Sequence, residues 1–139
     1  MNELSLEAFD AAAGAVGDGP VVMVNLLRFR ARTEYPAGFE GARPDPRSAY
    51  YEGYVGGFRA AAAELGVSAT LVYAGHWVSG LLAGPEDGWD DIVVVRYERF
   101  ADLRAILASE SYARGAVPHR LAGIADWRFI ATRARGQAG

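Results

Sequence analysis

Residues 21–29 read VVMVNLLRF, and this stretch decides the fold. It is β-branched and apolar at both alternating sets of positions, which is typical of a central strand whose two faces are both covered. The same reasoning predicts three more strands, at 70–79, 91–97 and 124–132. Gly75 lies inside the second of these, and a glycine there favours a bulge or a tight contact.

Helical spacing of apolar residues separates the strands. A first helix is expected after Ser5, a good N-cap, and should stop at Gly17. Asp45-Pro46 has the pattern of an N-cap and first helical position, and this helix should end at Gly66. A third helix begins near Phe100, with a further helical turn over residues 109–112. The second helix contains three glycines, each costing about 1 kcal/mol relative to alanine, so close approaches should compensate: Gly53, Gly56 and Gly57.

The element order is a helix followed by β-α-β-β-α-β. This order predicts an α+β fold of the ferredoxin-like type, with a four-stranded antiparallel sheet and two helices on one face. Residues 1–139 form a single domain, with an N-terminal helix and turn (1–19), a lid-like loop (30–46) and a flexible tail (133–139). The uncovered face is expected to expose Met23, Asn25 and Leu27, and a second copy closing the sheet into a barrel would cover it.

Composition excludes several classes of function. All 14 basic residues are arginine and there is no cysteine, which excludes a lysine Schiff base, a P-loop lysine, thiolate chemistry and cysteine-held metals. The net charge of -3 argues against a nucleic-acid partner. With no recognisable signal peptide or membrane-spanning run, we expect a cytoplasmic protein with no membrane partner.

Five segments carry a resemblance to a known family: PVVMVNLLRFR (20–30), AYYEGY (49–54), WDDIVVVRY (89–97), SESY (109–112) and PHRLAGIADWRFIAT (118–132). In these the chain resembles the dimeric α+β-barrel superfamily, and within it a bacterial domain-of-unknown-function family with NLLRF and PHR motifs. The resemblance implies a homodimer. Members of the superfamily include cofactor-free monooxygenases of polyketide aromatics, cyclases, muconolactone isomerases and haem enzymes. Relatives tend to have Pro-Ser where this chain has Glu98-Arg99 before the third helix.

Three residues are the candidate catalytic groups: His119, Arg120 and His76. A histidine can act as acid or base near neutral pH, and an adjacent arginine supplies a fixed positive charge. His119 could equally satisfy a helix end, and His76 could lie at a sheet edge. No spaced metal-ligand signature is present, so no metal and no organic cofactor are expected.

The candidate substrate-binding residues are polar or aromatic side chains on apolar elements: Asn25, Arg28, Tyr50, Tyr54, Tyr73, Trp77, Arg96 and Arg128. The strand arginines could instead form ion pairs with Asp91, Glu98 or Asp126, and the tyrosines could simply pack. Tyr50 and Tyr54 share a helical face that differs from that of Tyr51 and Phe58, so one pair at most should reach a pocket. The acidic patch from Glu86 to Asp91 is interpreted as a solvated turn.

These residues favour a small-molecule enzyme that acts on a hydrophobic, carbonyl-bearing, polyketide-like substrate. Proton transfer, oxygenation, cyclisation or isomerisation fits the groups present. The alternative is a non-catalytic dimeric module that binds a small ligand or serves in a stress response.

Overall fold

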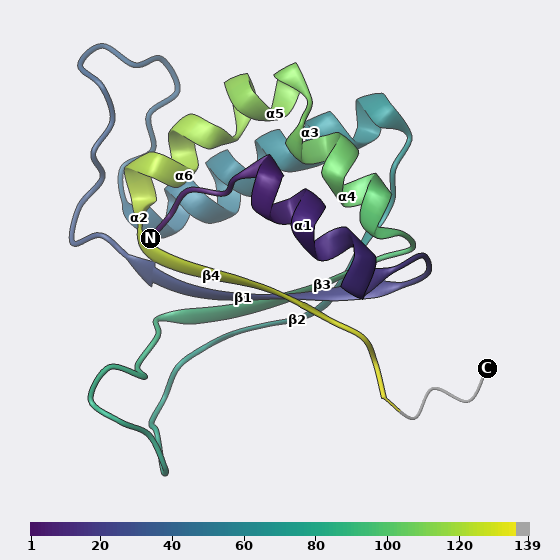
Figure 1. Ribbon diagram of the computed structural model, residues 1–139. Helices are drawn as coiled ribbons and strands as arrows, with labels where there is room; N and C mark the ends of the chain where they lie inside the picture. Colours follow the sequence, from purple (N-terminus) through teal and green to yellow (C-terminus); the bar gives the residue numbers. More distant parts are fainter. Residues whose placement is uncertain (136–139) are drawn as a thin grey trace.

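The structure is a computed structural model that describes residues 1–135 (Figure 1). The last four residues of the predicted flexible tail, 136–139, lie outside the described residues. In chain order the elements are α1 (Leu6–Val16), β1 (Val21–Phe29), α2 (Pro46–Ser48), η1 (Ala49–Tyr54), α3 (Val55–Leu65), β2 (Ala69–His76), β3 (Asp91–Tyr97), α4 (Phe100–Leu107), α5 (Glu110–Gly115), α6 (Val117–Gly123) and β4 (Ile124–Thr132).

The four strands form one antiparallel sheet in the order β2-β3-β1-β4. All helices cover the same face of this sheet, and the opposite face is open (Figure 1). The predicted ferredoxin-like βαββαβ fold with an extra N-terminal helix is therefore confirmed. Within residues 1–135, no helix combines the length and the apolar character that crossing a membrane requires.

The assignment of the two sheet faces was wrong. Met23, Asn25 and Leu27 are buried, and Met23 and Leu27 belong to the core under the helices. The open face is formed by the other set of positions, because β1 is apolar on both sides and alternation alone does not say which side meets the helices. The strand register places these side chains on the open face: Val22, Val24, Leu26, Ile92, Val94, Tyr73 and Ile130.

The helix predicted to begin after Asp45 is one continuous helical segment made of α2, η1 and α3. Asp45 caps it through a reciprocal pair of hydrogen bonds with Ser48, and Gly66 ends it at a φ of 67°. Its middle, η1, is wound as a π-helix. Such wide turns are rare in α-helices and frequent at functional sites.

Two of the three helical glycines make the expected close approaches. A Cβ on Gly53 would lie 2.4 Å from the ring of His119, and one on Gly57 would lie 2.1 Å from the carbonyl oxygen of Gly115. Gly56 faces open space, so no close approach compensates for that glycine.

The strand β2 differs from its prediction in two ways. It ends at His76, so Trp77 follows the strand, and its register shifts between Leu71 and Tyr73 instead of at Gly75. Gly75 makes the alternative tight contact, since a Cβ there would meet the Tyr73 side chain at 2.2 Å. Helix α4 starts without a side-chain cap, because Arg99 stands at its N-cap.

Candidate functional site

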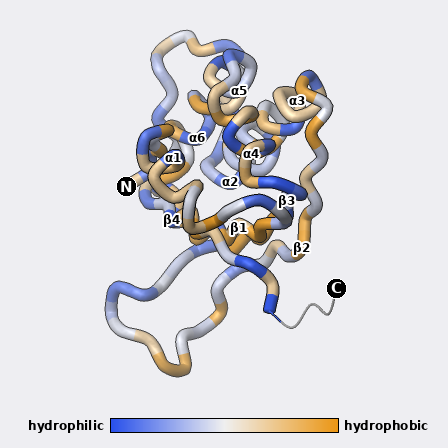
Figure 2. Tube along the Cα trace, turned by 45° about the vertical axis from the view of Figure 1, so that its right-hand side comes forward, coloured by the Kyte–Doolittle hydropathy of each residue, from blue (hydrophilic) through white to orange (hydrophobic). Residues whose placement is uncertain are grey.

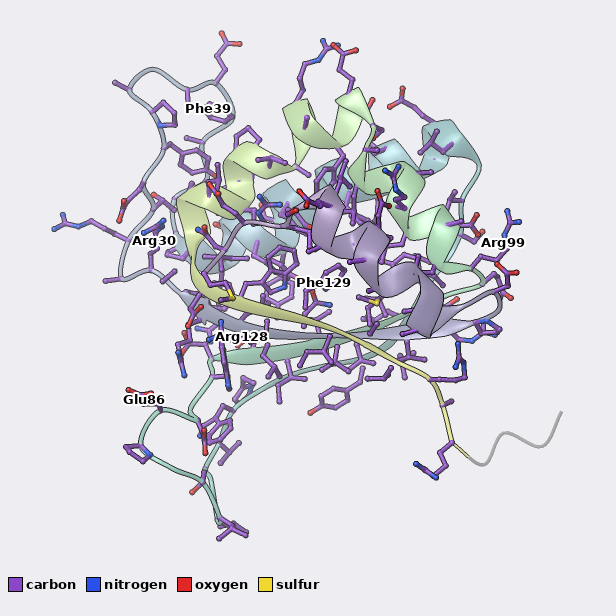
Figure 3. The ribbon with its side chains drawn as sticks, in the orientation of Figure 1. Arg30, Phe39, Glu86, Arg99, Arg128 and Phe129 are labelled. Carbon is purple, nitrogen blue, oxygen red and sulfur yellow. The ribbon has the colours of Figure 1, made fainter. Side chains whose placement is uncertain are left out.

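A cavity of about 530 Å³ lies between the sheet and the helical segment formed by η1 and α3. Its walls are largely apolar. The sheet contributes Asn25, Leu71, Val93, Val95 and Phe129, and the helices contribute Tyr50, Tyr54, Phe58 and Ala62. In Figure 3, Phe129 points to the helix side of β4 and Arg128 to the open side.

Tyrosine side chains supply most of the polar groups of this cavity: Tyr50, Tyr51, Tyr54 and Tyr97. Burial raises the pKa of Tyr50 and of Tyr97 above the usual value, so both hydroxyls stay protonated at neutral pH. The expectation that one tyrosine pair at most reaches a pocket was wrong, since Tyr51 and Phe58 line the cavity together with Tyr50 and Tyr54. Three of these side chains, Tyr50, Tyr51 and Tyr54, come from η1, which is wound as a π-helix.

Two polar wall residues, Asn25 and Tyr54, form hydrogen bonds with side chains that do not line the cavity. The Asn25 amide nitrogen donates to the Val93 carbonyl at 3.1 Å, and its oxygen accepts from the Trp127 indole at 3.0 Å. The Tyr54 hydroxyl oxygen is 2.9 Å from the Tyr112 hydroxyl oxygen. Arg120 in turn donates a hydrogen bond to the Tyr112 hydroxyl at 2.8 Å. Arg120 is therefore joined to the cavity through two tyrosines.

A second hollow of about 410 Å³ is lined by Arg47, Tyr51, Ala74, Gly75, His76 and Asp91. Tyr51 and Ala74 are wall residues of both. Asp91 is buried at 4% exposure, accepts from Arg47 at 2.8 Å and accepts a hydrogen bond from the Tyr51 hydroxyl. His76 is exposed and stands opposite Asp91 in the β2–β3 register.

Asp91 is the site residue that sequence reasoning missed. The acidic patch was interpreted as a solvated turn, which fits the exposed Glu86, Asp87 and Asp90 but not Asp91. The missed signal is strand alternation. Asp91 is the first residue of β3, two positions before buried Val93, and therefore lies on the inner face.

His119 and Arg120 are neighbours in sequence but point to different places. His119 lies under the loop of residues 30–45, where its Nδ1 is 2.7 Å from the Tyr35 hydroxyl and its ring contacts Phe39 edge-on. Burial, and then the charge of Arg43, lowers the His119 pKa below its usual value. Neither His119 nor any residue of this loop lines the cavity. The catalytic role of His119 and the lid role of the loop stay predictions.

The remaining candidates lie on or beside the open face of the sheet. Arg28 and Arg128 pair with Asp126 at 2.9 and 2.7 Å, and Arg96 pairs with Glu98 at 2.5 Å. These are the predicted alternative ion pairs, although Asp91 pairs with Arg47 instead of a strand arginine. Tyr73 is 56% exposed on the open face, and Trp77 follows the end of β2.

Among residues 1–135, no three histidine, aspartate or glutamate side chains converge in an arrangement that would hold a metal ion. No protein-family model and no curated protein matches the sequence.

Solved structures do resemble the chain. It is similar to the RPA0582 protein of Rhodopseudomonas palustris, a protein of unknown function, with a TM-score of 0.76 and 25% identity over 96% of this chain and 95% of that one. The methylated form of RPA0582 matches with a TM-score of 0.79 and 23% identity over 100% of this chain and 98% of that one. This chain and that protein share a fold.

Proposed function

We propose that the protein binds a small, largely apolar molecule with a carbonyl group in the cavity under η1 and α3, and catalyses proton transfer beside that carbonyl without a metal or organic cofactor. The observation that carries this proposal is the cavity itself, about 530 Å³ with apolar walls and tyrosine hydroxyls. Ligand pockets of ~300–1,000 Å³ typically combine apolar walls with a few orienting polar groups.

The second hollow, which shares Tyr51 and Ala74 with the cavity, supplies a base. Both carboxylate oxygens of Asp91 already accept hydrogen bonds, one from Arg47 and one from Tyr51. His76 lines the same hollow and is exposed, and imidazole is the commonest general base of enzymes. We assign the base to His76, with Asp91 fixing the position of Tyr51 beside it.

The proposed proton transfer needs no oxidant or reductant. His76 takes a proton from the carbon next to the carbonyl, and the electron pair of that C–H bond moves to the carbonyl oxygen to form an enolate. Returning the proton to another carbon isomerises the molecule, and returning it to the same carbon exchanges it with solvent. Oxygenation or cyclisation of an enolisable substrate can also start from an enolate, which is why proton transfer is the step to test.

The test uses 2-tetralone, an apolar enolisable ketone, in deuterated buffer, with the loss of its α-proton signals followed by NMR. We expect the wild type to accelerate exchange and His76→Gln to lose roughly 10²- to 10⁴-fold of that acceleration. Ala74→Leu, which narrows both hollows, should block binding, whereas Ala125→Leu at an exposed position outside the cavity should not. Binding without accelerated exchange would make the protein a non-catalytic ligand-binding module, and no binding would contradict the proposal.

The proposed working form is a homodimer of the α+β-barrel type, as in the family that the chain resembles. The open sheet face has an apolar centre with the ion pairs of Arg28, Arg96 and Arg128 around it. The β2–β3 loop projects beyond this face on the side away from the helices (Figure 1). Leu81 and Leu82 of this loop are 97% and 100% exposed, and the lower tip of the loop is hydrophobic in Figure 2. An exposed apolar patch with a projecting apolar loop favours burial against a partner, and a second copy presents a matching face.

A further inference from the structure

We infer that the Tyr54 hydroxyl is the donor that stabilises negative charge on the ligand oxygen, and that Arg120 and Tyr112 are positioning residues that act through it. This inference rests on the proposed function, because it names the group at the oxygen end of the same cavity. It follows from a chain of three side chains, Arg120, Tyr112 and Tyr54, in which Arg120 donates to Tyr112 and either tyrosine hydroxyl can donate to the other.

The chain starts at a buried charge without a counter-charge. Arg120 is only 6% exposed, and its Nε has no hydrogen-bond partner. None of the ion pairs among residues 1–135 includes it. Its guanidinium donates to the Tyr112 hydroxyl and lies over the Trp127 ring, 5.4 Å from the ring centroid. A buried guanidinium is normally paired with a carboxylate, so this one has a use that packing does not explain.

The hydrogen-bond donors can be followed from Arg120 through Tyr112 to Tyr54, a wall residue of the cavity. Arginine has no acceptor, so the Tyr112 oxygen accepts from Arg120. The Tyr112 hydrogen then needs an acceptor, since Tyr112 is 4% exposed and a buried unpaired donor is costly. The Tyr54 oxygen, 2.9 Å away, can be that acceptor, and an anionic ligand oxygen in the cavity would select this direction over the reverse one. In this direction the Tyr54 hydrogen is free, and because Tyr54 is a wall residue of the cavity, we assign that hydrogen to the oxygen of a ligand bound there.

The same chain sets the strength of this donor. Burial raises the pKa of Tyr54 well above its ordinary value, so the hydroxyl keeps its proton, and the charge of Arg120 acts in the opposite direction and makes that proton more acidic. A donor backed by a charged donor forms stronger hydrogen bonds to an anionic oxygen than to a neutral one. Tyr54 therefore favours the enolate over the ketone, which is the discrimination that catalysis requires.

The experiment compares two probes of similar shape, 4-nitrophenolate and 4-nitrotoluene. The first carries an anionic oxygen where the second carries a methyl group. Binding of each is measured by calorimetry at a pH where the phenol is ionised. We expect the wild type to prefer 4-nitrophenolate, and Tyr54→Phe and Arg120→Met each to reduce the ratio of the two affinities roughly 10- to 100-fold. Arg120→Lys, which keeps the charge, should restore part of the ratio. Tyr35→Phe, the same substitution outside the cavity, should leave it unchanged.

Urea unfolding of the ligand-free variants distinguishes a role of Arg120 in ligand binding from a role in stabilising the fold. If Arg120 serves the ligand, replacing it by the apolar methionine should leave the urea midpoint unchanged or raise it, because an unpaired buried charge is removed. Variants that bind 4-nitrotoluene normally and keep the wild-type ratio would overturn this inference and leave the proposed cavity intact. A wild type that binds neither probe would overturn the proposed function and this inference together.

Discussion

The close crossing of α3 and α5 allows a matched pair of substitutions in one helix. Gly57→Ala places a Cβ 2.1 Å from the carbonyl oxygen of Gly115, whereas Gly56→Ala meets nothing within 4 Å. Ordinary contact begins at 3.4 Å, so Gly57→Ala requires the two backbones to separate by about 1.3 Å, the difference between 3.4 and 2.1 Å. Both substitutions gain about 1 kcal/mol of helix propensity, and only the first incurs an overpacking cost of about 1–3 kcal/mol.

The two variants should therefore differ by about 1–3 kcal/mol in free energy of unfolding, with Gly56→Ala more stable than the wild type by up to about 1 kcal/mol. Urea unfolding followed by far-UV circular dichroism measures both, with the wild type as reference and equal m-values as the check that the unfolded states are comparable. Equal stability of the two variants would refute the crossing geometry of α3 and α5.

Two further predictions concern the surface. The wild type should have a dimer mass by light scattering at micromolar concentration, burying on the order of 1,600 Å² in total, and Leu82→Glu at the loop tip should shift it toward the monomer; a monomeric wild type would contradict the proposed assembly. The lowered pKa of His119 means that the unfolded chain binds more protons at this site than the folded chain between the two pKa values. Stability should therefore be lost as pH falls through the unfolded value near ~6.5, and His119→Gln should flatten this part of the urea-midpoint profile between pH 5 and 8; an unchanged slope would show that His119 does not contribute.

The sequence was sufficient for the strands and for their order, because VVMVNLLRF and DIVVVRY are long β-branched runs bounded by turn residues. The sequence was not sufficient to predict which face of the sheet is buried under the helices. Met23 and Val24 are equally apolar, and only the packing of Tyr50, Leu103 and the other core residues against Met23 determines which face is buried.

The candidate site shows the same limit. Arg120 was identified from its motif, but its pairing with Tyr112 depends on α6, which runs through Pro118 and turns successive residues to different sides. Pro118 is tolerated there because the first turn of a helix needs no backbone donor. The π-helix of η1 has no recognisable sequence signal, so the gathering of Tyr50, Tyr51 and Tyr54 at one cavity required the structure.

A crystal structure with 4-nitrophenolate bound tests the central claim most directly. We expect the ring to lie between the sheet and α3, against Phe58 and Val95, with the phenolate oxygen within ~2.5–3.0 Å of the Tyr54 hydroxyl. A probe bound under the 30–45 loop beside His119, or on the open face of the sheet, with the cavity empty, would contradict it.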